Sequence, residues 1–286
     1  MKEILKLDHI QKYYGNGGNV TKAIQDISFS VQEGEFVGIM GASGSGKTTL
    51  LNCISTIDMV SAGHIYLDGT DVTEINEKQI ARFRRENLGF VFQDFNLLDT
   101  LTISENIALA LTINKVPAGE IDGRVREMAG KLNITDILDK YPYQVSGGQK
   151  QRVAVAGIIA MRPLCIVLDE PTAMLDPSGR REVLDTVKKL NKEEGITILL
   201  ITHYMDEAVQ ADRVVVMDDG VIRLDGAPRA VFAHVDELKA LGLDVPQATE
   251  LADRLGFAEH AVLNTAECVD VLISNLEEQK LGCTDL

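Results

Sequence analysis

The chain has 286 residues, of which 45% are hydrophobic and 25% charged, a balance that is typical of globular proteins and excludes a disordered or fibrous chain. Basic residues number 28 and acidic residues 43, so the formal net charge is −15, which argues against bulk binding of nucleic acid phosphates; we expect no nucleic acid partner. No apolar run approaches the ~18 residues of a membrane-spanning helix, and the first ten residues are rich in charge. We therefore expect a protein of the cytosol or of the cytosolic face of a membrane. The four cysteines form no C-x-x-C pair and are interpreted as reduced thiols.

The N-terminal third begins with strand patterns. Apolar and polar residues alternate over the first thirty or so positions, which predicts antiparallel strands around a turn at Gly15–Gly18. The short apolar run 36–40 then leads through a glycine-rich turn into a helical pattern over 47–57. Strand, glycine turn and helix in this order begin a βα unit.

The middle of the chain changes character twice. Residues 76–139 favour helices with charged faces, such as 77–85 and 120–132, and indicate an inserted helical subdomain. Near-continuous apolar runs follow, each preceded by a helical segment. These runs cover 165–168, 196–202 and 213–217. Buried strands that alternate with helices predict an α/β fold with a mostly parallel sheet.

The C-terminal segment, residues 227–286, differs from the rest in charge. It holds four basic residues and eleven acidic ones, and its apolar residues fall at helical spacing. We predict a small acidic helical extension.

A phosphate-binding loop is predicted between the strand at 36–40 and the following helix. The segment from Gly41 to Thr48 fits G-x-x-x-x-G-K-[ST], whose glycines let backbone N–H groups surround a polyphosphate at a helix N-terminus. Lys47 would contact the β- and γ-phosphates, and the Thr48 hydroxyl would bind Mg²⁺. The candidate nucleotide-binding residues here are Gly41, Ser43, Gly44, Ser45, Gly46, Lys47, Thr48 and Thr49.

Two adjacent acids end the apolar run at 165–168. Because the carboxyl ends of parallel strands face the ligand crevice, Asp169 is a candidate Mg²⁺ ligand and Glu170 a candidate general base for an attacking water. His203 follows the next run and could donate a hydrogen bond to a γ-phosphate. The alternatives are an ordinary Asp-Glu-Pro surface turn and a histidine that only packs.

A second glycine loop, Ser146-Gly147-Gly148-Gln149, precedes a helical segment over 150–161. Its serine and bare N–H groups at a helix N-terminus suit an anion. Since the first loop already covers one face of a nucleotide, this second loop is best explained if it meets the γ-phosphate of a nucleotide held by another copy.

Taken together, residues 1 to about 226 resemble the ATP-binding subunits of ABC transporters. The matching elements are the Walker A loop (41–48), Gln93 in Val-Phe-Gln-Asp, the signature Ser-Gly-Gly-Gln (146–149, preceded by Val145 rather than leucine), the Walker B acids Asp169 and Glu170, Leu175-Asp176, and His203. The resemblance implies a P-loop NTPase fold, ATP and Mg²⁺ as ligands, and ATP hydrolysis.

The same resemblance implies further roles. Tyr14 would stack on the adenine, although its neighbour Tyr13 is also a candidate by position. Gln93 would bind near Mg²⁺ and sense the transmembrane partner, and Asp176 would lie at a dimer seam.

The two parts of the chain resemble different subfamilies of these ATPases. Residues 1–152 are similar to the ATPases of lipoprotein-release, macrolide and bacitracin-type peptide exporters, as in 41–52 and 88–98. Residues from 153 onward are similar to the ATPases of energy-coupling-factor vitamin importers, which also carry a helical C-terminal extension. We accordingly expect an ATP-binding domain over 1–226, with its helical subdomain at about 94–160, and an extension over 227–286.

The sequence thus predicts an ATPase that dimerises around ATP, with itself or with a second ATPase subunit, and drives a transmembrane permease from the cytoplasmic face of the membrane. The main interpretation is that the transporter moves a peptide or a lipoprotein. An energy-coupling-factor ATPase for vitamin or metal-ion uptake is the alternative, and a soluble ABC ATPase without a transporter is a further one.

Overall fold

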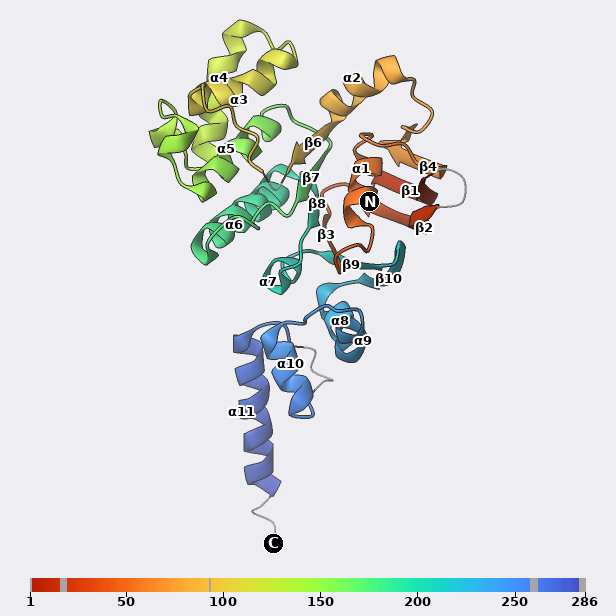
Figure 1. Ribbon diagram of the computed structural model, residues 1–286. Coiled ribbons are helices and arrows are strands. Elements are labelled where there is room, and N and C mark those ends of the chain that lie inside the picture. Colours follow the sequence, from red (N-terminus) through yellow and green to blue (C-terminus); the bar gives the residue numbers. More distant parts are fainter. Residues whose placement is uncertain (1, 16–19, 93, 258–261, 283–286) are drawn as a thin grey trace.

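The computed structural model contains two sheets with helices around them (Figure 1). It describes residues 2–15, 20–92, 94–257 and 262–282. The antiparallel sheet, the mostly parallel sheet, the inserted helices and the C-terminal helices all occur, so the predicted fold class is confirmed.

The antiparallel sheet has the strand order β2-β1-β4-β5. Its bounds are β1 Glu3–Tyr14, β2 Thr21–Gln32, β4 Ala62–Leu67 and β5 Thr70–Asp71. The two strands pair antiparallel, as predicted, and buried residues alternate with less buried ones over residues 27–31 of β2; elsewhere the alternation is interrupted, and the pairing register shifts several times along β1. Most of the predicted turn at Gly15–Gly18 lies outside the described residues.

The larger sheet has the order β10-β9-β3-β8-β7-β6. Its bounds are β3 Phe36–Gly41, β6 Leu88–Val91, β7 Cys165–Asp169, β8 Thr197–Ile201, β9 Arg213–Asp218 and β10 Val221–Gly226. From β9 to β6 all neighbours are parallel, and only β10 pairs antiparallel. Every residue of β3 and β8 is buried, which explains why these strands are apolar without alternation.

Among the described strands, the sequence reading missed β4, β5, β6 and β10, and β6 also contradicts a stated expectation. Residues 76–139 were expected to be helical, but β6 (Leu88–Val91) follows directly on α2 (Glu77–Asn87) and pairs with β7 at the edge of the larger sheet. Four residues are too few to display a period, and the preceding helix is strongly polar. The pairing partner, more than seventy residues away, decides the conformation.

The helix after the glycine turn, α1 (Lys47–Ile54), is three residues shorter than predicted. Thr56 adopts the left-handed conformation with φ 57°, and the N–H groups of Ile57 and Asp58 both donate to the Asn52 carbonyl. These two hydrogen bonds satisfy a carbonyl at the end of the helix, and the left-handed residue turns the chain away from the helix axis.

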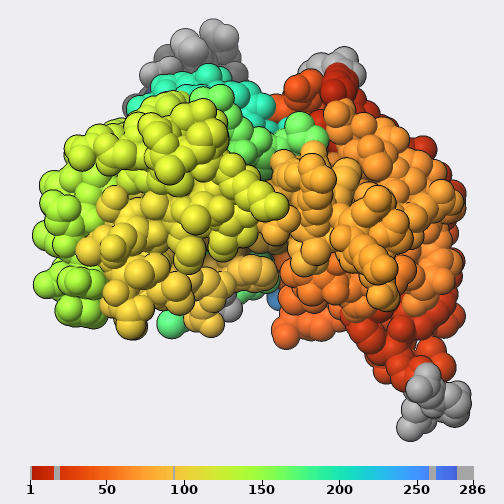
Figure 2. Space-filling view, turned by 90° about the horizontal axis from the view of Figure 1, so that it is seen from above, coloured from red at the N-terminus to blue at the C-terminus, as the bar shows by residue number. Residues whose placement is uncertain are grey.

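The inserted helices pack on one another beside the parallel sheet. They are α3 Ile103–Ile113, α4 Ala118–Lys131 and α5 Gly147–Ile159, followed later in the chain by α6 Pro177–Glu194 and α7 Met205–Ala208. Buried aliphatic residues of α3, α4 and α5 share one core with β7 and α6. Figure 2 shows this region (yellow to green) as a lobe beside the orange lobe that contains α2.

The C-terminal helices fall into two pairs. They are α8 Pro228–Phe232, α9 Val235–Ala240, α10 Gln247–Arg254 and α11 Thr265–Gly282. Phe232 and Leu238 pack into a core with Met40 and Val214 of the larger sheet, whereas α10 and α11 enclose a small cluster of their own around Ala252 and Cys268. In Figure 1, α10 and α11 project away from the two sheets.

No helix within the described ranges combines the length and the apolar composition that crossing a membrane requires. Three of the cysteines, Cys53, Cys165 and Cys268, are free thiols in the interior, and Cys283 lies outside the described residues. Burial raises the pKa of both Cys53 and Cys165 to about 12, so these two thiols stay protonated.

Candidate functional site

The glycine loop lies where β3 ends and α1 begins, at the carboxyl end of a strand flanked by parallel neighbours. Gly46 caps α1 with φ 101°, and a Cβ added there would lie 2.5 Å from the Ala23 carbonyl oxygen. The backbone of β2 therefore leaves no room for a side chain at this position. Such a close approach presents the loop's N–H groups at the start of α1, as phosphate binding requires.

The Lys47 ammonium is hydrogen-bonded within the loop. Its Nζ donates to the carbonyl oxygens of Gly41 at 2.7 Å and Ala42 at 2.9 Å. Burial lowers the pKa of Lys47, while the charges of Glu170 and Asp169 act in the opposite direction. An ammonium that is partly desolvated and bound by neutral oxygen atoms, the two carbonyls and the Ser45 hydroxyl, is well placed to exchange them for phosphate oxygens.

An open cavity of about 490 Å³ surrounds this loop. The predicted residues that line it are Gly41, Ser43, Gly44, Gly46, Lys47, Thr48, Thr49, Glu170 and His203. Ser45 is buried beneath the loop. The structure thus brings together residues from three separate strand ends, which is the arrangement that the parallel-sheet reading expected.

The two adjacent acids occupy the end of β7. Asp169 is the last residue of the strand, and Glu170 follows it with a positive φ of 45° and an N–H that donates to the Ile201 carbonyl. Burial first, and the neighbouring Glu170 charge second, raise the pKa of Asp169, whereas Lys47 lowers it. A half-buried carboxyl pair with a nearby ammonium is a set of oxygen ligands that a divalent cation would stabilise.

His203 reaches the same point from the end of β8. Its Nδ1 lies 3.4 Å from Glu170 Oε1, and its ring lies against that of Tyr204. Nearly half of the His203 side chain is exposed, so the ring borders the cavity rather than the core.

The second glycine loop is a helix cap. The exposed Ser146 accepts a hydrogen bond from the Gln149 N–H, while the Gln149 side chain accepts one from the Ser146 N–H. A Cβ on Gly148 would lie 3.4 Å from Gly179 Cα, and Gly179 donates its N–H to Asp176, the cap of α6. The starts of α5 and α6 are therefore adjacent.

The predicted site residues thus form two groups. Among the described residues, neither 146–149 nor Asp176 lines the cavity around the glycine loop. Tyr14 lies near the first group, because the Thr49 side chain, which lines the cavity, acts on the pKa of its hydroxyl and opposes the rise that burial causes. Gln93 lies outside the described residues.

Other residues of the cavity were missed by the sequence reading. Thr21, Lys22 and Ala23 of β2 line it, as does Asp219 from the turn between β9 and β10. The Asp-Asp-Gly sequence at 218–220 signals a turn, but no pattern shows that this turn lies beside the glycine loop. The Gly220 N–H donates to the Ser45 carbonyl and so joins this turn to the glycine loop.

Glu207 is a further residue that the sequence reading missed. It is 2% exposed and accepts hydrogen bonds from the hydroxyls of Thr172 and Thr202. Thr172 follows the acids of β7, and Thr202 precedes His203. One buried carboxyl therefore joins the loop after β7 to the loop that carries the histidine.

We expect Glu207→Leu to lower the free energy of unfolding by about 2–4 kcal/mol, because two buried threonine hydroxyls lose their acceptor. Burial raises the pKa of Glu207, so its ionised form opposes folding at pH 7 and this penalty disappears as the pH falls through the folded-state pKa. Glu207→Gln keeps an acceptor oxygen and carries no charge, and should stay within about 1 kcal/mol of the parent. Urea unfolding at pH 7 measures both, with exposed Glu237→Leu as control; equal losses in the two Glu207 variants would contradict this role.

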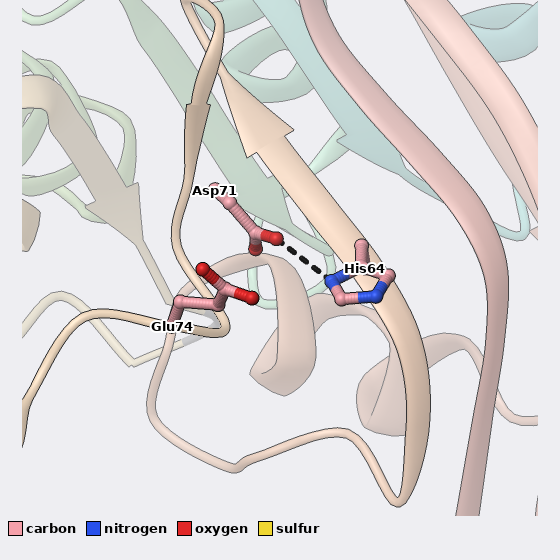
Figure 3. A group of neighbouring side chains, drawn as sticks. All are labelled: His64, Asp71 and Glu74. Carbon is pink, nitrogen blue, oxygen red and sulfur yellow. Dashed lines mark hydrogen bonds and ion pairs between the residues drawn. The ribbon is translucent and has the colours of Figure 1, made fainter.

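A separate group of possible metal ligands lies on the antiparallel sheet (Figure 3). It comprises His64, Asp71 and Glu74, whose ligand atoms lie within 4.8 Å of one another. Asp71 already accepts hydrogen bonds from the N–H and hydroxyl of Thr73 and lies 2.7 Å from His64 Nδ1. This group stabilises the β4–β5 hairpin and includes neither Thr48 nor Asp169, the candidate Mg²⁺ ligands.

Comparison with known proteins decides the family. Residues 24–173, more than half of the chain, match the ABC transporter family. The chain belongs to the ATP-binding subunits of ABC transporters. The protein is therefore an ATPase that binds ATP and serves a transporter, as its loop and strand-end residues predicted.

The curated relatives include both kinds that the sequence suggested. The energy-coupling factor transporter ATP-binding protein EcfA1 of Caldanaerobacter subterraneus is 45% identical over 257 residues, covering 89% of this chain and 92% of that protein. The bacitracin export ATP-binding protein BceA of Halalkalibacterium halodurans is 45% identical over 219 residues, covering 77% and 87%. Because the EcfA1 match extends further along the chain, the comparisons support the energy-coupling-factor alternative better than the peptide-exporter reading.

Solved structures agree with this assignment. CbiO1 of Clostridium perfringens, described as part of the ABC transporter complex cbiONQ, has a TM-score of 0.76 and 33% identity, covering 88% of this ABC ATPase and all of that chain. The ATP-binding cassette MJ0796, solved as a dimer bound to ADP and Pi, has a TM-score of 0.71 and 35% identity, covering 79% and 99%.

Proposed function

We propose that this ABC ATPase is the nucleotide-binding subunit of an energy-coupling-factor type importer, dimerising around two ATP molecules on the cytoplasmic face of a membrane. The proposed dimer rests on one observation: the two groups of site residues lie apart within a single subunit. Each subunit has a complete phosphate loop, but its Ser146–Gln149 loop lies away from its own cavity. A head-to-tail pair, with itself or with a second ATPase subunit, would supply that loop from the partner.

The surface around the second loop supports such a pairing. Met174 and Tyr143 are 63% and 66% exposed, and both belong to the segments next to the signature loop and Asp176. Exposed methionine and tyrosine are side chains that interface cores favour. The capped N-terminus of α5, with its serine hydroxyl and N–H groups, would then face the γ-phosphate held by the other subunit.

The residues in and near one cavity have separate roles in binding and hydrolysing ATP. Lys47 and the backbone N–H groups of the loop hold the β- and γ-phosphates, and Tyr14 receives the adenine. Glu170 accepts a proton from the attacking water, and His203 donates a hydrogen bond to the γ-phosphate. Phosphate contacts from both subunits close the dimer, so that loss of the γ-phosphate loosens it.

The donor set also fits Mg²⁺. Thr48 borders the cavity and Asp169 is a half-buried carboxylate beside a second acid, so both would hold the ion, with Gln93 as a third ligand. When bound, Mg²⁺ neutralises charge on the phosphate oxygens.

The most specific part of this proposal is the identity of the membrane partner. The resemblance of residues from 153 onward to importers, together with the long match to EcfA1, favours a permease that works with a small vitamin-binding membrane protein. The resemblance of 41–52 and 88–98 to exporters, together with the BceA match, favours a large-loop peptide permease instead.

Affinity purification from detergent-extracted membranes of the source cells distinguishes these partners. We expect the tagged chain to retain a transmembrane subunit and a small substrate-binding membrane protein, identified by mass spectrometry against an untagged control. Recovery of a large-loop permease would favour the peptide exporters. Recovery of the ATPase without any membrane protein would contradict the transporter role and favour a soluble ABC ATPase.

A further inference from the structure

Three side chains form a compact cluster beside the phosphate cavity. Lys12 and Tyr14 lie two residues apart at the end of β1 and therefore share one face of the strand. Asp58 comes from the loop after α1, and its N–H donates to the Asn52 carbonyl of that helix. The cluster thus connects the antiparallel sheet to the helix that begins with Lys47.

Lys12 is the centre of the cluster. Although a lysine, it is only 9% exposed. Its Nζ donates to Asp58 Oδ1 at 2.5 Å and to the Met59 carbonyl at 2.7 Å, and it lies 4.8 Å from the centroid of the Tyr14 ring. An ammonium at this distance is attracted by the ring, and here it is also largely withdrawn from water.

The Tyr14 hydroxyl is held by the same carboxylate. It donates to Asp58 Oδ2 at 2.6 Å. Burial first, and then the bond to Asp58, raise the pKa of Tyr14 to about 12, so the hydroxyl remains a donor at neutral pH. Burial pushes the pKa of Asp58 upward, but the bonds from Lys12 and Tyr14 outweigh it and hold that pKa below its ordinary value. The carboxylate therefore stays ionised between its two donors.

These contacts restrain the ring on one side only. The ammonium of Lys12 occupies one side of the ring, the hydroxyl is fixed by Asp58, and 40% of the side chain is still exposed. A ring held in this way loses little freedom when a flat group stacks on its open face, which favours binding. The neighbouring Tyr13 differs, because its hydroxyl donates to Gln11 and makes no bond to Asp58.

We propose that Lys12 and Asp58 are positioning residues that hold Tyr14 as a one-sided platform for the nucleotide base, and that this pair sets the preference of the site for ATP over a polyphosphate without a base. The proposal rests on the proposed function, in which Tyr14 receives the adenine. It adds that the ring must be held by the ion pair beneath it.

The test compares ATP with inorganic tripolyphosphate by isothermal titration calorimetry on the full chain. Tyr14→Phe keeps the ring and removes the hydroxyl that donates to Asp58. Lys12→Met keeps the aliphatic stem and removes the ammonium. We expect each to weaken ATP binding by about 3- to 10-fold, and Tyr14→Ala by more, since that variant loses the aromatic ring on which the base stacks. Affinity for tripolyphosphate should stay unchanged, because that ligand has no base to stack on the ring.

Tyr13→Phe is the matched control and should bind ATP like the parent. If Tyr14→Ala weakens ATP binding while Tyr14→Phe and Lys12→Met do not, the ring stacks on the base without help from the pair, and the proposal is wrong. If the variants lose affinity for both ligands equally, the cluster supports the phosphate loop rather than a base platform, which also overturns it. Failure of the parent protein to bind ATP would instead refute the proposed site itself.

Discussion

Replacement of Glu170 by glutamine should abolish most ATP hydrolysis while leaving ATP binding intact. Glu170 is positioned by the turn at the end of β7 and borders the phosphate cavity beside His203. The amide cannot accept the proton of the attacking water, and loss of a general base lowers the rate by about 100-fold or more. Because the γ-phosphate then persists between the two loops, the variant should also accumulate as a closed dimer in ATP.

Two measurements check this expectation. Phosphate release gives the rate, and size-exclusion chromatography with and without ATP gives the dimer. Glu86→Gln is the matched control, since Glu86 is exposed on α2, pairs with Arg82 and lies in neither group of site residues. Hydrolysis by Glu170→Gln at the parental rate would exclude Glu170 as the base, and a monomeric variant in ATP would argue against a γ-phosphate clasp between copies.

Two inactive variants should restore activity when they are mixed. Lys47→Met removes the ammonium from the phosphate loop, and Ser146→Arg places a bulky cation at the exposed start of α5; each alone should lose almost all hydrolysis. In a head-to-tail pair, one mixed site combines the two defects and the other is complete. Random pairing of equal amounts should therefore restore about a quarter of the parental rate if each site works by itself.

The double variant Lys47→Met/Ser146→Arg provides the control. Mixed with either single variant, it offers no complete site and should restore nothing. Ser146→Arg also removes a helix cap, at a cost of about 1 kcal/mol, so thermal unfolding should show that the variant remains folded. No recovery in the mixture of single variants would show that two copies of this chain do not share working sites, and would direct attention to a second ATPase subunit.

The local motifs were predictable because their chemistry depends on near neighbours in the chain. A glycine loop between a strand and a helix, acids at a strand end, and a histidine after the next strand each follow from a few adjacent residues. Parallel strands bring their carboxyl ends to one edge, so the meeting of Lys47, Glu170 and His203 followed from the sheet itself.

Other features depend on contacts between distant segments. β6 is four residues long and is a strand because β7 lies beside it. Glu207 looks like an ordinary acid of a short helix until Thr172 and Thr202 enclose it. Lys12 and Asp58 are 46 positions apart, and nothing near either residue indicates that they meet beneath Tyr14.

Short sequence patterns were enough to predict the family, the fold class and the candidate residues of the phosphate loop, because backbone geometry and strand ends impose such patterns locally. Packing between distant segments settles which of those residues line one cavity within a subunit, and it places the Ser146 loop apart from that cavity. It also decides which buried charges hold the site residues in place. The physical reason is that burial and pairing of charges depend on packing between segments far apart in the chain, which no local pattern records.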